Sequence, residues 1–407
     1  MNFVFISPNF PIRYYLFVEA LRRKGVNVLG IGDSVNKDLE PRLVASLTEY
    51  YFVKDLSDEK AMEEAVAYYQ RKYGKIDYIE SNNEWWLTLD AHLRQKFNVT
   101  SGFFPDQMEH IKAKSAMKEY FRQGGAKTMR YILVDGPSDK QKALFFIKQV
   151  GYPVFVKPNV GVGASDSYSL KNEEDVDAFF SKPLPETYIM EEFIDGTIVS
   201  FDGVCNSRGE VVFATSDHFP VPVADVVNDQ IDDYYWTNPF SLPMDDIDAQ
   251  GFLETGKKVV KAFGISKRVF HIEFFVLNQD KPGFAKKGEF VALECNMRPA
   301  GGYTPDLIDF AESASIYDIY ADVICFDENR EDMTKEKYYS FTSARRDCYS
   351  YLHSEQEILD KYRYQLTMHG RYPSHMADAM GDSYYYARFK TKEEGLAFVS
   401  FVRAKAK

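Results

Sequence analysis

The sequence predicts an α/β protein made of several lobes. In residues 1–110, short apolar runs alternate with helical patterns, which is typical of a parallel sheet with crossover helices. The strands and helices expected there are 2–6, 12–24, 26–31, 58–73, 76–80 and 84–97. Farther along, longer apolar runs interrupted by acidic residues indicate strands of α+β lobes. A chain of 407 residues also exceeds what one hydrophobic core usually supports, so two or three lobes are expected.

The rest of the chain divides into three further segments. Residues 111–200 predict a small α+β lobe, and residues 201–330 predict a larger lobe with long strands. Residues 331–407 indicate a small closing unit. The elements expected outside the large lobe are a strand at 128–134, a helix at 138–150, strands near 337–344, 347–352, 364–368 and 382–390, and a helix at 391–403.

Composition excludes several classes of function. The formal net charge of −12 argues against a general nucleic-acid-binding protein, which needs a basic face. Cys205, Cys295, Cys325 and Cys348 show no C-x-x-C spacing, so we expect reduced thiols rather than a zinc site or disulfides. The N-terminal run reads as a buried strand, without a cleavage site or a membrane span. We therefore expect a cytoplasmic protein with no membrane partner.

Two apolar strands that carry acidic residues are the most informative feature of the chain. Side chains alternate across a strand, so Glu294 and Asn296 share one face. Glu273, on another such strand, is placed to converge with them. Hard oxygen donors of this kind suit Mg²⁺, with Mn²⁺ as an alternative. Arg298 continues the row and predicts a clamp for an anion. The competing interpretation is that both glutamates are solvated residues on a half-exposed sheet.

A lysine followed by glycines predicts a phosphate-binding loop. A short β-rich run ends in Lys157, and Gly161, Gly163 and Ser165 follow in the next turn. Glycine lets backbone amides approach phosphate oxygens closely, and the lysine adds a point charge. The order of residues is not that of a Walker A motif. A plain glycine turn between two strands explains the pattern equally well.

A further strand predicts contacts with a planar base. It runs into Glu191, Glu192, Phe193 and Ile194 before the chain turns at Gly196. Backbone donors and acceptors at the end of such a strand suit the edge of the base, and its apolar side chains suit the faces.

In this order, the segments resemble the ATP-grasp superfamily, and within it the carboxylate–amine ligase type. The resemblance covers roughly residues 1–404. It implies a three-lobed ATP-grasp architecture with an N-terminal parallel α/β domain. The implied units are a Rossmann-like pre-ATP-grasp domain at 1–110, the small ATP-grasp lobe at 111–200, the large lobe with the metal site at 201–330 and a C-terminal cap subdomain at 331–407.

The resemblance also implies roles for individual residues. The implied ATP-binding residues are Lys114, Lys157, Gly161, Gly163, Ser165, Glu191, Glu192, Phe193 and Ile194. The implied metal ligands are Glu273, Glu294 and Asn296. Arg298 and Lys157 are the implied catalytic residues, since the family arginine stabilises an acyl phosphate. The candidate substrate contacts are Arg298, Gly301, Gly302 and Arg345, although an exposed basic pair explains Arg345 and Arg346 equally well.

Several positions carry weaker expectations. Relatives often place a glutamate that holds the ribose where this chain has Ile198, which accepts no hydrogen bond. The proline-rich segment 217–243 predicts a lid or the wall of an acceptor pocket. We expect His271 to be a satisfied core histidine, and Glu84 to open a helix that Asn83 caps.

The function implied by the resemblance is ATP-dependent ligation. A small-molecule carboxylic acid is activated as an acyl phosphate, and an amine, an amino acid or a thiol then attacks it, with release of ADP and phosphate. The implied cofactors are ATP and Mg²⁺. The sequence does not define the oligomeric state, and a homodimer is one option. The alternatives are a phosphotransferase of the same fold and a non-catalytic ATP-binding protein, which Ile198 favours.

Overall fold

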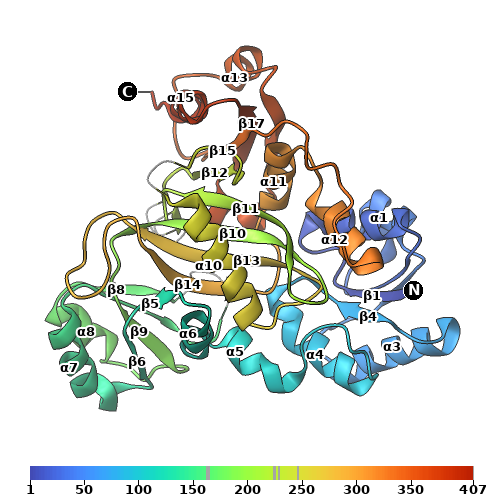
Figure 1. Ribbon diagram of the computed structural model, residues 1–407, viewed down its shortest axis with the longest axis horizontal. Coiled ribbons are helices and arrows are strands. Elements are labelled where there is room, and N and C mark those ends of the chain that lie inside the picture. Colours follow the sequence, from blue (N-terminus) through green and yellow to red (C-terminus); the bar gives the residue numbers. More distant parts are fainter. Residues whose placement is uncertain (162–165, 223–225, 228–229, 245–246, 407) are drawn as a thin grey trace.

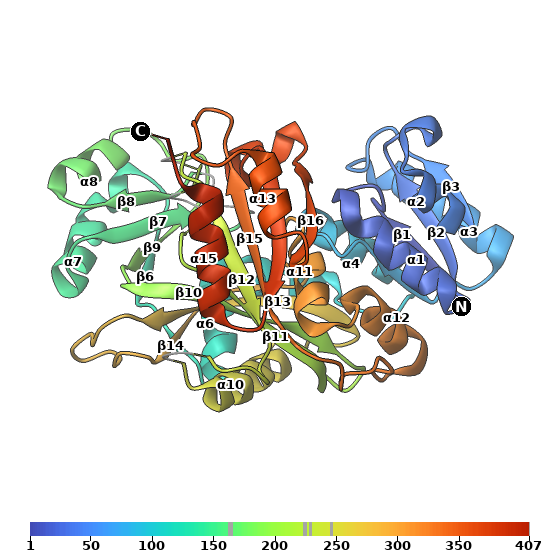
Figure 2. The same ribbon diagram turned by 90° about the horizontal axis from the view of Figure 1, so that it is seen from above.

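The computed structural model describes residues 1–161, 166–222, 226–227, 230–244 and 247–406. Among these residues the strands form three sheets. The N-terminal sheet lies at one end of the molecule and the small sheet at the other, with the largest sheet between them (Figures 1 and 2).

The N-terminal sheet is parallel, in the order β3-β2-β1-β4, as the alternation of strands and helices predicts. Its strands are β1 (Asn2–Ile6), β2 (Asn27–Gly32), β3 (Glu49–Phe52) and β4 (Tyr78–Glu80), and its helices are α1 (Tyr15–Arg23), α2 (Pro41–Ser46), α3 (Glu59–Tyr73) and α4 (Leu87–Lys96). Phe3 and Phe5 belong to one hydrophobic cluster, and Val4 and Ile6 to another. Helices cover both faces, which explains why β1 is apolar from Phe3 to Ile6.

The small sheet is antiparallel, in the order β6-β9-β7-β8. Its strands are β6 (Tyr131–Val134), β7 (Val154–Pro158), β8 (Tyr168–Leu170) and β9 (Tyr188–Glu192), and its helices are α7 (Lys140–Val150) and α8 (Glu173–Phe179). The helices pack on the sheet through a cluster that includes Phe146, Ile147, Val176 and Met190. Pro158 ends β7 directly after Lys157, because proline has no amide to donate to the ladder.

The third sheet has nine strands in the order β16-β17-β15-β12-β11-β10-β13-β14-β5. Their bounds are β5 (Lys127–Thr128), β10 (Gly196–Cys205), β11 (Val211–Phe219), β12 (Tyr234–Asn238), β13 (Arg268–Leu277), β14 (Phe290–Asn296), β15 (Tyr339–Arg345), β16 (Leu366–Arg371) and β17 (Ser383–Phe389). The sheet is continuous on both sides of residue 330.

Seven more α-helices have bounds that bear on the site or its support, and they are α5 (Met108–Lys112), α6 (Lys114–Gln123), α10 (Ala249–Ala262), α11 (Thr304–Glu312), α12 (Ile316–Phe326), α14 (Ala377–Met380) and α15 (Lys392–Arg403). Phe252 of α10 packs against Phe274 and Phe290 of the central sheet, with ring centroids 5.3 and 4.7 Å away. Thr391 caps α15 and forms a capping box with Glu394. No helix in the described part of the chain is long and apolar enough to cross a membrane.

Two expectations about the later elements are wrong. Segment 217–243 is not a lid throughout, because Tyr234, Tyr235 and Trp236 lie in β12 inside the nine-stranded sheet, where Trp236 is only 6% exposed. Trp236 pairs with Phe341 of β15 in register, and the two rings stack at 5.3 Å. Residues 347–352 form turns rather than a strand, and within them Tyr351 makes an isolated bridge to Lys405.

A buried ion cluster fixes the N-terminal sheet against the central one. Glu80, at the end of β4, is paired with Arg94 of α4 at 3.0 Å and with Arg268 of β13. Arg268 also donates to the carbonyl of Met297 at 2.8 Å. The carboxyl end of the parallel sheet therefore lies next to the turn that follows β14.

Candidate functional site

The candidate site starts from one polar face of the central sheet. Glu273 of β13 lies directly across from Glu294 of β14, and His271 lies across from Asn296. The alternation of side chains along both strands places all four on this face. Asn296 is 5% exposed, whereas the side chains of Glu273 and Glu294 are 27% and 23% exposed.

Lysines from α6 and β7 lie beside these carboxylates. Lys114 Nζ lies 3.3 Å from Glu294 Oε1 and donates to the carbonyl of Gly161 at 3.1 Å. The start of α6 is fixed to the end of β7, because the amides of Lys114 and Ser115 donate to the carbonyl and the side chain of Asn159 at 2.8 and 3.0 Å. Segments more than forty residues apart thus meet at the start of the predicted phosphate loop.

A buried triad lies deeper in the same region. Glu191 of β9 accepts from Lys157 at 3.1 Å and is also paired with Lys118 of α6. Lys118 follows Lys114 by one helical turn, so the two ammonium groups share one side of α6. All three members of the triad are at most 7% exposed.

The pKa values in the triad follow from burial and charge. Burial acts to raise the pKa of Glu191, but Lys118 and Lys157 outweigh it and hold this pKa at about 2. Burial acts to lower the pKa of Lys157, and Glu191 and Glu294 reverse the shift so that it is raised. The pKa of Lys118 is lowered, because burial outweighs the attraction of Glu191. Glu191 and Lys157 are therefore both ionised at neutral pH.

Arg298 lies at the open end of the row. It donates from Nη2 to Asn296 Oδ1 at 3.4 Å and from Nη1 to the carbonyl of Pro299 at 2.9 Å. These contacts orient the planar guanidinium beside the carboxylate face, where a fork of donors suits a carboxylate or a phosphate.

The N-terminal lobe contributes Glu84 to the surroundings of Arg298. Asn83 caps the short helix that Glu84 opens, by accepting from the amide of Trp85 at 3.0 Å, as expected. In addition, burial raises the pKa of Glu84, while Arg298 and Lys112 act against that rise. The Glu84 carboxyl thus lies within electrostatic range of the guanidinium.

His271 joins the carboxylate face to a chain of polar groups inside the sheet. Its Nδ1 lies 2.7 Å from Asp202 Oδ1, and its Nε2 lies 3.0 Å from Glu273 Oε1. Burial acts to lower the pKa of His271, but the two carboxylates raise it to about 10. Asp202 is bonded in turn to Ser200. The expected core histidine is indeed satisfied, and its partner Glu273 is a residue of the site.

Other predicted residues lie apart from this cluster. Glu192 points away from Glu191 and is paired with Arg130 and Lys281 at 2.7 and 3.1 Å. Phe193 is exposed, whereas Ile194 is buried in a cluster with Leu277 and Val291. The predicted Gly163 and Ser165 fall outside the described residues. Ile198, in β10, lies between Phe219 and Phe275, which are apolar partners.

The side chain of Arg345 contacts the C-terminal segment of the chain. It is 7% exposed and donates to the carbonyls of Val402 and His353 at 2.6 and 2.8 Å. Its guanidinium also lies over the ring of Tyr351 at 4.4 Å. These contacts join β15 to the end of α15. We therefore propose no substrate contact for Arg345.

Gly301 and Gly302 lie in the turn between Arg298 and α11. Gly302 has φ +63°, and a Cβ there would lie 2.4 Å from Met380 Cε. A side chain at this position would therefore be strained and would clash with α14, whereas a Cβ on Gly301 meets no atom within 4 Å.

The donor set suits a hard cation. Two carboxylates and one amide oxygen, on paired strands, are oxygen ligands of the kind that Mg²⁺ prefers. In the described part of the chain, no group of three or more His, Cys, Asp and Glu side chains is arranged as a metal cluster. A cation at Glu273, Glu294 and Asn296 would thus take its remaining ligands from substrate or water.

Sequence reasoning did not single out Lys118, Glu84 or Asp202 as members of this region. Lys118 is one helical turn after Lys114, a spacing that indicates a shared face. Asp202 ends a Ser-x-Asp alternation in β10 that faces the His-x-Glu alternation of β13. The proximity of Glu84 depends on the packing of two lobes, and its local signal is its place after a strand, where open α/β sheets bind ligands.

The comparisons with known proteins point to ligases. No protein-family model matches the chain. The L-arginine-specific L-amino acid ligase of Bacillus subtilis is 23% identical over 282 residues, which are 66% of this chain and 62% of that protein. The large chain of carbamoyl phosphate synthase from Thermotoga neapolitana is 24% identical over 200 residues, which are 47% of this chain and 17% of that one. The chain thus spans less than two thirds of either curated relative.

Solved structures match over nearly the whole chain. The L-amino acid ligase from Bacillus licheniformis has a TM-score of 0.71 at 14% identity, covering 98% of this chain and 95% of that one. The ADP complex of N5-carboxyaminoimidazole synthetase from Staphylococcus aureus has a TM-score of 0.69 at 16% identity, covering 98% and 96%. At these identities the likeness establishes a shared fold.

Proposed function

From the ATP-grasp fold, which this chain shares along almost its whole length with the ligase structures above, we infer that it is an ATP-dependent carboxylate–amine ligase. It activates a small-molecule carboxylic acid as an acyl phosphate and forms an amide bond, with release of ADP and phosphate. Since the relatives include two amino-acid ligases, amino acids are the first substrates to examine. The proposed compartment is the cytoplasm.

One observation carries this proposal. Lys114 and Lys157 come from separate elements and converge with Glu294 and Glu191 at the carboxylate face of β13 and β14. Positive charge next to a pair of hard carboxylates is the arrangement that a magnesium–triphosphate substrate needs. A sheet whose acidic residues were only solvated would not bring buried lysines to them, because burying an ammonium group is costly.

Each residue has a task in the proposed site. Glu273, Glu294 and Asn296 would hold Mg²⁺, which when bound neutralises phosphate charge. Lys114 and Lys157 bind phosphate oxygens. His271 orients Glu273, because its imidazole is fixed from the other side by Asp202.

Arg298 orients the substrate carboxylate for the first step. A carboxylate oxygen attacks the γ-phosphorus of ATP, and the bond from that phosphorus to the β–γ bridging oxygen breaks, so ADP leaves. The amine nitrogen then attacks the carbonyl carbon and loses a proton, and phosphate leaves with the electrons of the C–O bond. The fork of Arg298 offsets charge on the acyl phosphate oxygens.

The test is a phosphate-release screen with paired libraries of acids and amines. We expect ADP and phosphate to appear in equal amounts, and only when an acid and an amine are both present. Glu294→Gln should abolish this turnover, because it removes a charge from the proposed cation site at nearly constant volume. The matched control is Glu254→Gln, an exposed change in α10, which should leave turnover intact. Near-normal turnover by Glu294→Gln would contradict the assignment.

The same screen separates the alternatives. A phosphotransferase would yield a phosphorylated acceptor without free phosphate. A non-catalytic ATP-binding protein would be stabilised by ATP without forming ADP. A thiol in place of the amine as the required second substrate would identify a carboxylate–thiol ligase.

A further inference from the structure

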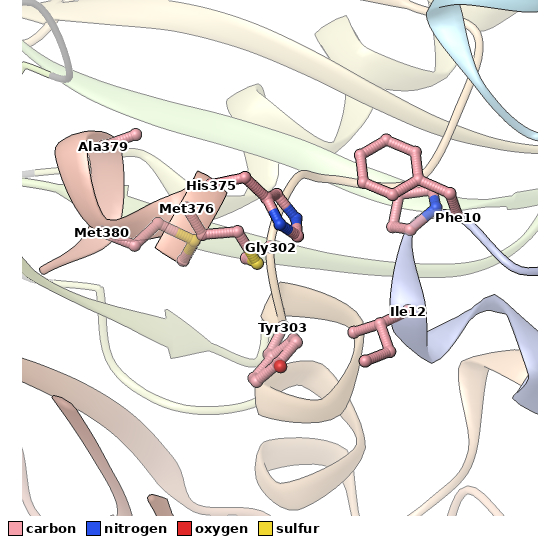
Figure 3. A pocket seen from close by; sticks show the side chains of 9 residues that line it. Phe10, Ile12, Gly302, Tyr303, His375, Met376, Ala379 and Met380 are labelled. Atoms are coloured by element: carbon pink, nitrogen blue, oxygen red, sulfur yellow. The ribbon is translucent and has the colours of Figure 1, made fainter. Parts of the chain in front are cut away.

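An apolar pocket lies next to the proposed site, between the N-terminal lobe and the C-terminal unit. Its volume is about 270 Å³. Figure 3 shows Phe10 and Ile12 on one side, His375, Met376 and Met380 on the other, and Tyr303 at the end of the turn between them. These residues come from three segments that are distant in the sequence.

The turn that follows β14 connects Arg298 with the pocket. Gly302, which lines it, is four residues after Arg298, and the segment between them is the turn that follows β14. On the N-terminal side, the side-chain amide of Asn83 donates to the carbonyl of Phe10 at 3.4 Å. The next residue, Glu84, lies within electrostatic range of Arg298. A molecule bound at the guanidinium can therefore extend a side chain toward Phe10.

Two arginine contacts hold the walls in place. Arg13 donates to Asp306 of α11 at 3.1 Å, which fixes the segment of Ile12 to the helix that follows Tyr303. On the other side, Arg346 donates to the carbonyls of Ala377 and Asp378 at 3.0 and 2.8 Å, which fixes the segment of Met376 and Met380. Hydrogen bonds from Arg13 and Arg346 therefore hold both walls of the pocket in place.

The lining favours an uncharged, apolar occupant. Apart from the imidazole of His375 and the hydroxyl of Tyr303, its side chains are hydrocarbon or thioether. The rings of Phe10 and His375 lie 5.6 Å apart. A charged group placed here would lose part of its hydration against hydrocarbon side chains, whereas methionines adapt to aliphatic and aromatic shapes.

We propose that this pocket binds the side chain of the carboxylic acid that the enzyme activates, and that this acid carries a medium-sized apolar side chain such as that of leucine, methionine or phenylalanine. The proposal rests on the proposed function for its link to Arg298. A cavity of about 150 Å³ already accommodates benzene, so 270 Å³ suffices for any of these side chains.

The test separates acid binding from chemistry. First, calorimetry measures the binding of leucine, methionine, phenylalanine, glutamate and lysine to the whole protein in the presence of Mg²⁺ and a non-hydrolysable ATP analogue. Second, hydroxylamine replaces the amine, so that hydroxamate formation from the same acids with ATP reports on the acid alone. We expect the three apolar acids to bind and react at least tenfold better than glutamate and lysine.

Variants of the walls address the pocket directly. Phe10→Ala and Met376→Ala should each lower kcat/KM for the preferred acid by about tenfold, because each removes apolar contact, and should leave the KM for the amine unchanged. Phe10 is 47% exposed, so its replacement spares the core. The matched control is Phe145→Ala, at a 66% exposed position of α7, which should change neither constant. Met380→Lys should shift the preference toward glutamate.

The outcomes are distinguishable. If the apolar acids bind, and bind more weakly to Phe10→Ala, but no acid gives hydroxamate, the pocket stands and the ligase function is wrong. If charged acids react as well as apolar ones, or if both wall variants keep the wild-type acid profile, the pocket assignment is overturned. An effect of the variants on the amine alone, or no binding of any apolar acid, would also overturn it.

Discussion

At the scale of single residues, the site depends on lysines that are buried against carboxylates. Lys157 and Lys118 flank Glu191, and Lys114 lies beside Glu294. Each ammonium group loses hydration, so the pairs persist only because opposite charges compensate for that loss. Phosphate oxygens would offer the same compensation, so the proposed function predicts a site that responds to nucleotide.

Lys157→Ala should remove most of the stabilisation by ATP. A ligand that binds only the folded state raises the melting temperature by mass action, and this change deletes a proposed phosphate contact. Thermal denaturation with and without Mg²⁺ and ATP measures the shift. Lys148→Ala, an exposed lysine on α7 of the same lobe, serves as the control and should keep the full shift. A full shift in Lys157→Ala would move the nucleotide elsewhere.

Glu191 should make the stability depend on pH in the acid range. Its pKa is held at about 2 in the folded protein against an ordinary value of 4.5. The stabilisation is therefore complete above pH 4.5 and is lost as pH falls through about 2. Urea denaturation at stepped pH should show the unfolding free energy of wild type falling by up to about 1.4 kcal/mol per pH unit more steeply than that of Glu191→Gln. Parallel curves would exclude this role.

At the scale of elements, the alternation of polar and apolar residues predicts some strands. Other strands form because segments distant in the sequence pair with them. The rows of β13 and β14 were predictable, because polar residues recur at every second position between apolar ones. The prolines that flank Tyr234–Asn238 predict a loop there. This segment is a strand because β11 and β15, the latter more than a hundred residues later, pair with it. Local sequence does not encode such a partner.

Trp236→Ala should destabilise the protein strongly. Trp236 is 6% exposed and stacks between His218 and Phe341 at 5.0 and 5.3 Å, so truncation leaves a cavity that costs about 3–5 kcal/mol. Chemical denaturation measures the loss. Trp85→Ala, at a 65% exposed position, is the matched control and should change stability by less than about 0.5 kcal/mol. A neutral result for Trp236→Ala is what a lid would give.

At the scale of the whole molecule, the site exists because three sheets meet. Its carboxylates were predictable from sequence, and so was the presence of lysines, and the spacing of Lys118 from Lys114 indicates a shared helix face. Glu84 joins the region only through packing between lobes. The apolar pocket has the same origin, since Phe10 and Met376 are brought together by the fold. Arg345 is a substrate candidate by sequence, but in the fold its side chain binds the C-terminal segment.

The ion cluster between the lobes should make them unfold together. Glu80→Gln leaves Arg268 and Arg94 buried with a weakened partner, and breaking a buried pair typically costs about 3–5 kcal/mol. Denaturation followed by two probes, tryptophan fluorescence and far-UV circular dichroism, should show one transition in wild type and a lower midpoint in the variant. An unchanged midpoint would mean that apolar packing alone holds the N-terminal sheet.

In the proposed reaction, the carboxylate of the acid attacks the γ-phosphorus of ATP. The most direct measurement uses an acid substrate labelled with oxygen-18 in its carboxylate and follows the label by mass spectrometry of the released phosphate. We expect one labelled oxygen in each phosphate formed, together with ADP. Phosphate without label, or the appearance of AMP and pyrophosphate with label in AMP, would contradict the acyl-phosphate mechanism.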